Sequence, residues 1–227
     1  MSPPDPHDEA WARTPPARAL RGLILRGVFG PLVRTRAAVE VVGREALDAI
    51  PGPVIFVANH ASHVDTPILL NALTPRRRRH TLVGAASDYF YARRALAVAV
   101  SLTFGTVPVR RRRSDEMASS LAPLERLLGE GFSLVLFAEG TRSRSGRLGE
   151  FRSGAAALAT RAQVPLVPVH LSGTAQLMPP GHSWMVAPAQ GRTHAVRIRF
   201  GAPLRPTTNR EVPAAMDEVR RFMVTSA

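Results

Sequence analysis

Short apolar runs alternate along the chain with longer segments of helical periodicity. Residues 53–58 and 133–137 are almost continuously apolar, which is typical of strands buried on both faces of a sheet. Further strands are predicted at 37–42, 80–84, 105–110 and 166–170. At 196–200 apolar residues alternate with arginines, which indicates a strand with one exposed face.

Helical periodicity fills most of the intervals between these strands. Helices are predicted over about 89–102, 114–128 and 154–163, and Pro123 predicts a kink in the second. Thr208 and Glu211 form a capping-box pattern before a last helix with the apolar stripe Val212, Met216, Val219 and Met223. Because strands and helices alternate throughout, the sequence predicts a single α/β domain with a largely parallel mixed sheet flanked by helices.

The first 36 residues differ from the rest, which predicts a tail at 1–36 and a folded domain at 37–227. Residues 1–14 are rich in proline and are expected to be disordered. Residues 17–29 predict a helix that Gly30 and Pro31 end. One side of this helix carries Leu20, Leu23, Ile24 and Val28, and the other carries Arg18, Arg21 and Arg26. Such a helix suits either an anionic membrane surface or packing against the domain.

Composition narrows the classes of partner and of chemistry. The chain has 30 Lys+Arg residues, all of them arginine, against 17 Asp+Glu, and its net charge is +13. The excess suits nucleic acid, anionic lipid, a phosphorylated substrate or an acidic carrier, although codon bias also explains a lysine-free chain. The lack of cysteine excludes disulfides and a cysteine nucleophile. No apolar run approaches the roughly 20 residues that span a bilayer, so membrane contact is expected to be peripheral.

A candidate catalytic pair lies in the segment 59–65, between the buried strand at 53–58 and a helix opened by Pro67. His60 is a candidate general base, because a neutral imidazole can accept a proton from an alcohol at neutral pH. Asp65 is its candidate partner, since a carboxylate on the other ring nitrogen fixes the tautomer. The spacing of the two residues is by itself unspecific.

Two further polar clusters follow predicted strands, and active sites of such sheets gather at the carboxyl ends of strands. Arg110 follows one strand, and Glu139 to Arg142 follows another. The two arginines can each bind a phosphate through two N–H groups, and Gly140 and Thr141 add backbone donors and a hydroxyl. Glu139 suits either a glycerol-like hydroxyl or an arginine. The runs Arg76–Arg79 and Arg111–Arg113 are expected to be solvent-exposed or carrier-facing, the first of them in a loop.

Four ordered blocks together resemble the glycerolipid acyltransferase family typified by 1-acyl-glycerol-3-phosphate (lysophosphatidate) acyltransferases. Asn59 to Asp65 matches the block NHxSxxD, and Gly105 with Arg110 matches the second block. Phe137 to Ser143 matches FPEGTRS, with Ala138 in place of proline, and Val164 to Val169 looks like the fourth block. The similarity covers roughly residues 38–205.

The resemblance implies transfer of an acyl group from acyl-CoA or acyl carrier protein to a lysophospholipid hydroxyl, giving phosphatidate when lysophosphatidate is the acceptor. It implies His60 as general base and Asp65 as its orienter. Substrate-binding residues would be Arg110, Glu139, Gly140, Thr141 and Arg142, with Asn59, Ser62, Gly105 and Pro168 in structural or secondary roles. No cofactor and no metal are implied. The enzyme would be cytoplasmic, peripheral on the inner face of the cell membrane, and another lysolipid or specialised acceptor is the alternative within the family.

Three other classes fit parts of the sequence. A serine hydrolase would pair Ser62 with His60, but no Gly-x-Ser-x-Gly elbow occurs. A metal hydrolase would use His60, His63 and Asp65, but a further histidine is missing at Thr66, so His63 is interpreted as a bystander. An arginine-rich nucleic-acid binding protein fits the charge, but only 6% of residues are aromatic and no binding motif accompanies the arginines, so no nucleic acid is expected.

Overall fold

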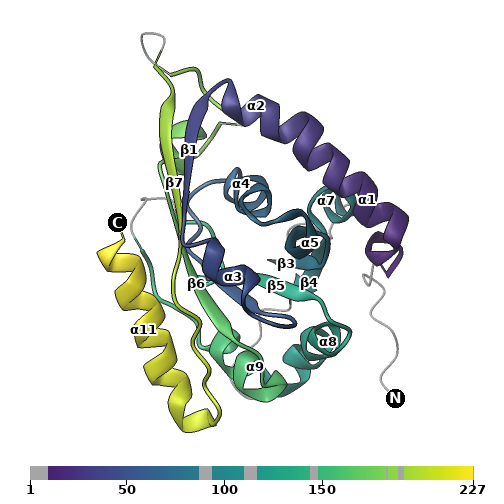
Figure 1. Cartoon of the computed structure of the whole chain (residues 1–227), viewed down its shortest axis with the longest axis vertical. Coiled ribbons are helices and arrows are strands. Elements are labelled where there is room, and N and C mark those ends of the chain that lie inside the picture. Colours follow the sequence, from purple (N-terminus) through teal and green to yellow (C-terminus); the bar gives the residue numbers. More distant parts are fainter. Residues whose placement is uncertain are drawn as a thin grey trace.

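The computed structural model describes residues 10–86, 94–109, 117–143, 148–182, 184–188 and 192–226. They form a seven-stranded sheet in the order β1-β7-β6-β2-β5-β3-β4 (Figure 1). The strands are β1 (Ala37–Val42), β2 (Ile55–Ala58), β3 (Thr81–Ala86), β4 (Thr106–Val109), β5 (Ser133–Phe137), β6 (Leu166–Ser172) and β7 (His194–Phe200). All neighbouring strands are parallel except β6 and β7, which confirms the predicted α/β domain with a largely parallel mixed sheet.

Helices cover both faces of this sheet (Figure 1). Helices α1 (Pro15–Ile24), α2 (Gly30–Arg34), α3 (Glu45–Asp48), α4 (Asp65–Ala72), α5 (Pro75–Arg79) and α7 (Arg94–Phe104) lie toward one side. Helices α8 (Met117–Gly129), α9 (Gly154–Ala162) and α11 (Val212–Thr225) lie toward the other. The short elements are η1 (Ala10–Arg13), the π-helical η2 (Leu25–Phe29), α10 (Thr174–Leu177) and η5 (Asn209–Glu211). The predicted helix start at Ser87 and Asp88 lies outside the described residues.

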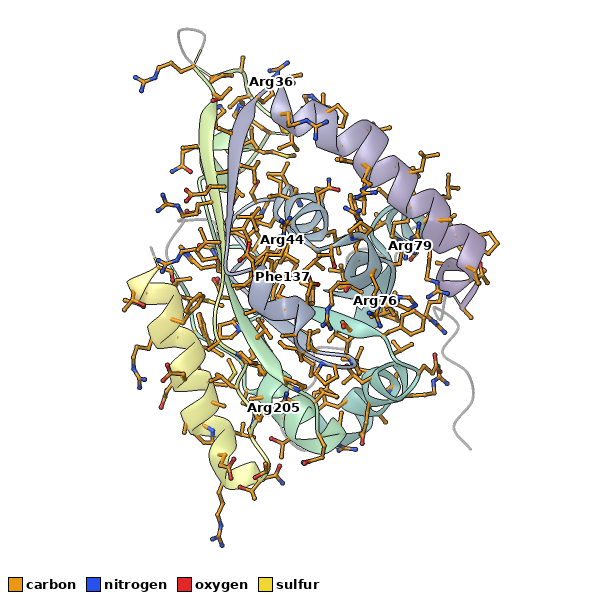
Figure 2. All side chains as sticks on the ribbon, viewed as in Figure 1. Arg36, Arg44, Arg76, Arg79, Phe137 and Arg205 are labelled. Carbon is orange, nitrogen blue, oxygen red and sulfur yellow. The ribbon has the colours of Figure 1, made fainter. Side chains whose placement is uncertain are left out.

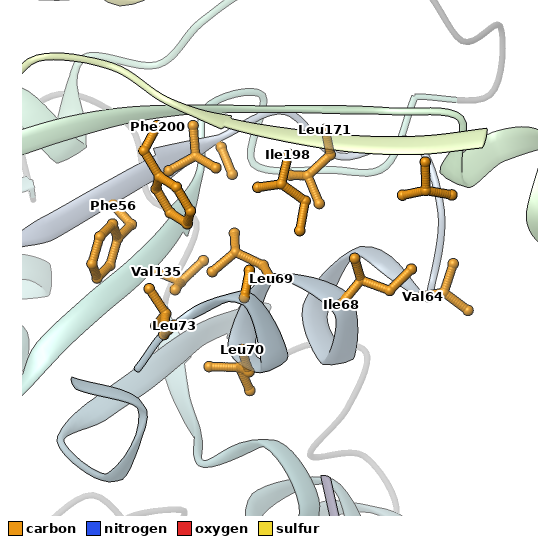
Figure 3. Packing of buried hydrophobic residues seen from close by; sticks show 14 of the residues in the cluster. Phe56, Val64, Ile68, Leu69, Leu70, Leu73, Val135, Leu171, Ile198 and Phe200 are labelled. Atoms are coloured by element: carbon orange, nitrogen blue, oxygen red, sulfur yellow. The ribbon is translucent and has the colours of Figure 1, made fainter. Parts of the chain in front are cut away.

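The core lies on both faces of β2, whose four residues are all fully buried. Because side chains of a strand alternate, Phe56 belongs to one apolar cluster and Ile55 and Val57 to the other. Phe56 packs edge-on against Phe200 of β7 in the cluster that also holds Leu69 of α4 (Figure 3). A strand that is buried on both faces positions the residue after it rigidly, and that residue is Asn59.

The N-terminal helical segment is longer than predicted at both ends. Ala10–Arg13 already form a 3-10 turn inside the segment expected to be disordered. Pro31 does not end the helix, because η2 takes a π-helical course before it, with the Gly30 N–H donating to Leu25 O five residues back. The wider π turn accommodates a proline that an α-helix interior would exclude. The segment then continues as α2 to Arg34.

This segment packs on the domain with its arginine side rather than its leucine side. Arg21 is 2% exposed and Leu25 is fully buried, whereas Leu20, Leu23 and Val28 are 45%, 69% and 56% exposed. Of the two alternatives, packing against the domain is therefore observed for one side of the helix. The side predicted to be apolar faces away from the protein.

The arginine run at 76–79 was predicted to be a loop and is instead the helix α5, which Thr74 caps and Pro75 opens. Arg77 donates to Gly52 O at 2.8 Å and, through Nη2, to Leu47 O and Ile50 O at 2.6 Å each. Arg78 is 4% exposed and donates to Asn71 Oδ1 at 3.0 Å. The solvent-exposed role expected for this run is wrong for both residues, because each guanidinium reaches acceptors on neighbouring segments.

We expect Arg77→Met to lower the free energy of unfolding by about 2–3 kcal/mol, because three carbonyl groups lose a charged donor. Arg76→Met removes an exposed arginine from the same helix and is expected to change it by less than about 0.5 kcal/mol. Urea denaturation of the two variants measures the difference. Equal losses would show that Arg77 acts only through its charge on α5.

Candidate active site

His60 is held by Asp65 in the turn between β2 and α4. The distance from His60 Nδ1 to Asp65 Oδ2 is 2.8 Å. The backbone N–H groups of Ala61 and Ser62 also donate to Oδ2, at 2.7 Å and 2.8 Å. Because this oxygen accepts both of them, it also accepts from Nδ1–H, which leaves the lone pair of Nε2 for a substrate proton. The geometry is that of a general base with its orienting carboxylate.

Asp65 is the first residue of α4 and is fully buried. A carboxylate at a helix N-terminus is stabilised by the helix dipole and by free N–H groups. His60 keeps 18% of its side-chain surface exposed. The carboxylate is therefore shielded from solvent, whereas part of the imidazole is accessible from outside.

Phe137 stacks on the imidazole of His60, with ring centroids 3.9 Å apart and planes inclined by 18°. Phe137 ends β5, and β5 pairs with β2 so that Phe137 lies beside Ala58. The side chain lies near the centre of the molecule in Figure 2. With Nδ1 bonded and one ring face covered, the orientation of the imidazole is fixed. Sequence reasoning placed Phe137 in a motif without a role, and no local signal pointed to this contact.

Glu139 lies close to His60 but is bonded to backbone rather than to an arginine. Its side chain is 8% exposed and its Oε2 accepts the Gly149 N–H at 3.2 Å. Burial raises the pKa of Glu139, while hydrogen bonds from the backbone N–H groups of Gly149 and His60 act in the opposite direction. The carboxylate thus joins the loop after β5 to the catalytic turn.

Two arginines lie beside this loop. Gly140 has φ of +66°, and a Cβ at this position would come within 2.8 Å of Arg152 Nε, so only glycine allows Arg152 to approach. Arg142 lies close enough to His63 for its charge to lower the pKa of that histidine, after the larger effect of burial. The Ser143 N–H donates to His60 O at 2.8 Å, which ties the loop to the catalytic turn.

The structure places His60, Asp65, Glu139 and Gly140 close together, with Arg142 near His63, and Thr141 is exposed on the same loop. Arg110 lies outside the described residues. Strand β4 ends at Val109 on the same edge of the sheet as β2, because β2, β5, β3 and β4 are parallel. Arg152 was missed by sequence reasoning, because it lies outside the motif and is brought to Gly140 only by the fold.

Three of the residues predicted to have structural or secondary roles form hydrogen bonds to neighbouring segments. Asn59 donates to Leu171 O at 2.9 Å and accepts the Leu171 N–H at 2.8 Å, so its amide joins β2 to β6. Ser62 Oγ donates to Met178 O at 2.8 Å. Pro168 lies in β6 beside Val57 and accepts the Gly201 N–H at 2.8 Å. Each of these contacts supports the strand ends that carry the site.

The metal-hydrolase alternative would use His60, His63 and Asp65 as ligands. Over the ranges that the structure describes, no three or more His, Cys, Asp or Glu side chains are grouped so that they could hold a metal ion. Burial, and then the charges of Arg142 and His60, lower the pKa of His63, and its interpretation as a bystander stays a prediction.

Comparisons with known proteins show the family of the chain. Residues 38–172 match the family model described as Acyltransferase. The chain is 32% identical over 149 residues to "1-acyl-sn-glycerol-3-phosphate acyltransferase BAT2, chloroplastic" of Brassica napus, covering 63% of this chain and 39% of the relative. It is 28% identical over 180 residues to "1-acyl-sn-glycerol-3-phosphate acyltransferase beta" of Homo sapiens, covering 77% and 59%. The chain thus spans about two fifths of the plant relative.

The fold is similar to that of a solved structure. The crystal structure of the 1-acyl-sn-glycerophosphate (LPA) acyltransferase PlsC from Thermotoga maritima matches with a TM-score of 0.63 and 22% identity, covering 96% of this chain and 83% of that one. At this identity the likeness concerns the fold. The family model supplies the stronger result, because it matches more than half of the chain and includes the catalytic turn and the Glu139 loop. The chain belongs to the acyltransferase family, as the four sequence blocks indicated.

Proposed function

We propose that the protein transfers an acyl group from acyl-CoA or acyl carrier protein to the hydroxyl of a lysophospholipid, with lysophosphatidate as acceptor and phosphatidate as product. The observation that carries the proposal is the hydrogen bond of 2.8 Å between His60 Nδ1 and Asp65 Oδ2, beside a loop that includes Arg142 and contacts Arg152. The curated relatives named above are 1-acyl-sn-glycerol-3-phosphate acyltransferases, which supports this choice of acceptor.

The proposed reaction uses His60 first as base and then as acid. Nε2 takes the proton of the acceptor hydroxyl while the oxygen forms a bond to the thioester carbonyl carbon. The tetrahedral intermediate collapses with cleavage of the C–S bond, and the imidazolium returns the proton to the leaving sulfur, giving an ester and a free thiol. Asp65 stabilises the imidazolium between the two steps. The chain has no cysteine, so the acyl group passes directly to the acceptor without an acyl-cysteine intermediate.

The acceptor phosphate is proposed to bind beside Gly140. Arg142 and Arg152 each offer a planar fork of N–H donors that matches phosphate oxygens. Arg110 would add a third guanidinium, since it follows β4 at the same edge of the sheet. Thr141 adds a hydroxyl on the exposed side of the loop.

The outward face of the N-terminal helix is proposed to lie on an anionic membrane surface. Leu20, Leu23 and Val28 are exposed on it, and the exposed Arg26 and Arg34 lie on the same segment, where they can meet anionic head groups. In the ranges that the structure describes, no helix combines the length and the hydropathy that crossing a bilayer requires. Peripheral attachment would present the site to a lysolipid in the membrane.

Mixing the purified protein with acyl-CoA and lysophosphatidate tests the function through release of free thiol and formation of phosphatidate. We expect His60→Ala to lower turnover about 10²–10⁴-fold, because the general base is lost. His80→Ala removes an exposed histidine that directly follows α5. This variant serves as the control and should retain activity. Wild-type turnover by the His60 variant would refute the assignment of the base.

For Arg142→Lys we expect the acceptor KM to rise about tenfold or more with little change in the acyl-donor KM. An ammonium group cannot reproduce the two parallel hydrogen bonds of a guanidinium to phosphate. Arg205→Lys makes the same change at an exposed position far from the labelled Phe137 (Figure 2) and should leave both constants unchanged. An unchanged acceptor KM in Arg142→Lys would remove this residue from the phosphate site.

Membrane attachment is tested by flotation with vesicles that contain anionic phospholipid. Leu23→Ser should weaken binding roughly tenfold, because a leucine that enters the interface contributes about 1.5–3 kcal/mol. Val224→Ser alters an exposed apolar residue of α11, 58% exposed against 69% for Leu23, and should bind as the wild type does. Equal binding by all three proteins would locate the membrane contact elsewhere.

A further inference from the structure

Arg21 is a buried cation that the proposed chemistry leaves unused. Its side chain is 2% exposed, yet its hydrogen bonds go to backbone carbonyl oxygens. Nη2 donates to Ala12 O at 2.7 Å and to Ser101 O at 3.0 Å, and Nε donates to Leu102 O at 3.0 Å. Arginine is seldom buried without a carboxylate, because desolvation of the charge is costly. Such a residue calls for a role beyond filling space.

The environment of Arg21 is unfavourable to its charge but does not remove it. Burial and then the charge of Arg18 lower its pKa to about 10, so it remains protonated at neutral pH. Its Nη1 is buried and has no hydrogen-bond partner among the described residues. The three carbonyl bonds are therefore what compensates for the desolvation.

These bonds hold the turn between α7 and β4. Ser101 and Leu102 lie in the last turn of α7, where a positive charge is favourable. Ser101 O also accepts the Gly105 N–H at 2.9 Å, and Ser101 Oγ lies 3.1 Å from Thr106 Oγ1 across the turn. Arg21 thus closes a helix end that leads directly into a strand.

The guanidinium also lies directly against Gly105. A Cβ on Gly105 would come within 2.8 Å of Arg21 Cζ, and Gly105 has φ of +68°. This contact joins an N-terminal residue to the glycine of the second sequence block. Gly105 O in turn accepts the Val83 N–H at 3.0 Å, which sets the start of the pairing between β3 and β4.

Strand β4 connects the Gly105 turn to Arg110, which is proposed to bind the acceptor. It runs from Thr106 to Val109, and the next residue in the sequence is Arg110, the arginine of the second block. Any displacement of Gly105 would act on the first residue of this strand. Beside the turn, Phe29 of η2 packs edge-on against Phe104 of α7, with ring centroids 5.6 Å apart.

We propose that Arg21 is a positioning residue for acceptor binding: it fixes the Gly105 turn and thereby the strand that leads into Arg110. This inference rests on the proposed function, since it assumes that Arg110 contacts the acceptor phosphate. It also connects two parts of the protein, because Arg21 lies on the helix whose opposite face carries Leu20 and Leu23.

The kinetic test uses a short-chain lysophosphatidate below its critical micelle concentration, so that membrane binding does not enter. Arg21→Met should raise the acceptor KM about tenfold while the acyl-donor KM stays unchanged, and Arg21→Lys should recover part of the loss, because a lysine still donates to carbonyls. Arg44→Met removes an exposed arginine to which no binding role is assigned and should behave as the wild type does. A rise in both KM values, or a fall in kcat alone that follows the fraction of folded protein, would overturn the proposal.

A double-mutant cycle with Arg110→Gln tests whether Arg21 acts through Arg110. If it does, Arg21→Met changes the acceptor KM less than about twofold in the Arg110→Gln background, although it changes it about tenfold in the wild type. Independent effects that multiply in the double variant would overturn the proposed route.

Amide hydrogen exchange gives a measurement that needs no activity. In Arg21→Met, peptides covering 101–109 should exchange about tenfold faster, while peptides covering 55–58 and the Arg44→Met protein should match the wild type. Unchanged exchange at 101–109 would overturn the role of Arg21 whatever the activity. Absence of thiol release by the wild-type protein would overturn the proposed function instead, so the two failures are distinguishable.

Discussion

The site depends on a single carboxylate oxygen. Asp65 Oδ2 accepts hydrogen bonds from His60 Nδ1 and from the backbone of Ala61 and Ser62, all between 2.7 and 2.8 Å. One buried atom therefore sets the shape of the turn and the tautomer of the imidazole together. The buried strand β2 before the turn and the helix α4 after it hold this oxygen in place. Proposed acyl transfer requires both effects, because Nε2 must be unprotonated and aimed at the acceptor.

Arginine side chains have two different roles in this lysine-free chain. Arg21 and Arg77 bind backbone carbonyls and join segments that are distant in the sequence. Arg152 lies instead against Gly140, and Arg142 belongs to the same loop as Gly140. Both are proposed to bind the acceptor phosphate. A guanidinium suits both uses because its several N–H groups point in fixed directions. The net charge of the chain therefore overstates how much positively charged surface is available to a polyanion such as nucleic acid, because some arginines bind backbone carbonyls instead.

Much of the fold followed from local patterns. The strands at 37–42 and 133–137 have the predicted bounds, and the stripe of Val212, Met216, Val219 and Met223 is buried as expected. Residues 10–13 form a 3-10 turn, although they were expected to be disordered. Two predicted breaks were also wrong, the end of the N-terminal helix at Gly30 and the loop at 76–79. In both, a local signal for a break was outweighed: by a π turn before Pro31, and by carbonyl partners for Arg77.

The sequence by itself determined the strands, the order of the motifs and the pairing of His60 with Asp65, because these depend on neighbours within a few residues. Tertiary structure alone decided which side of the N-terminal helix is buried, that Phe137 covers the imidazole, and that Arg152 approaches Gly140. The physical reason is the separation of the contacting residues along the sequence, since Arg21 and its acceptor Ser101 are 80 residues apart. No pattern within a segment specifies which carbonyl or ring a distant segment brings to it.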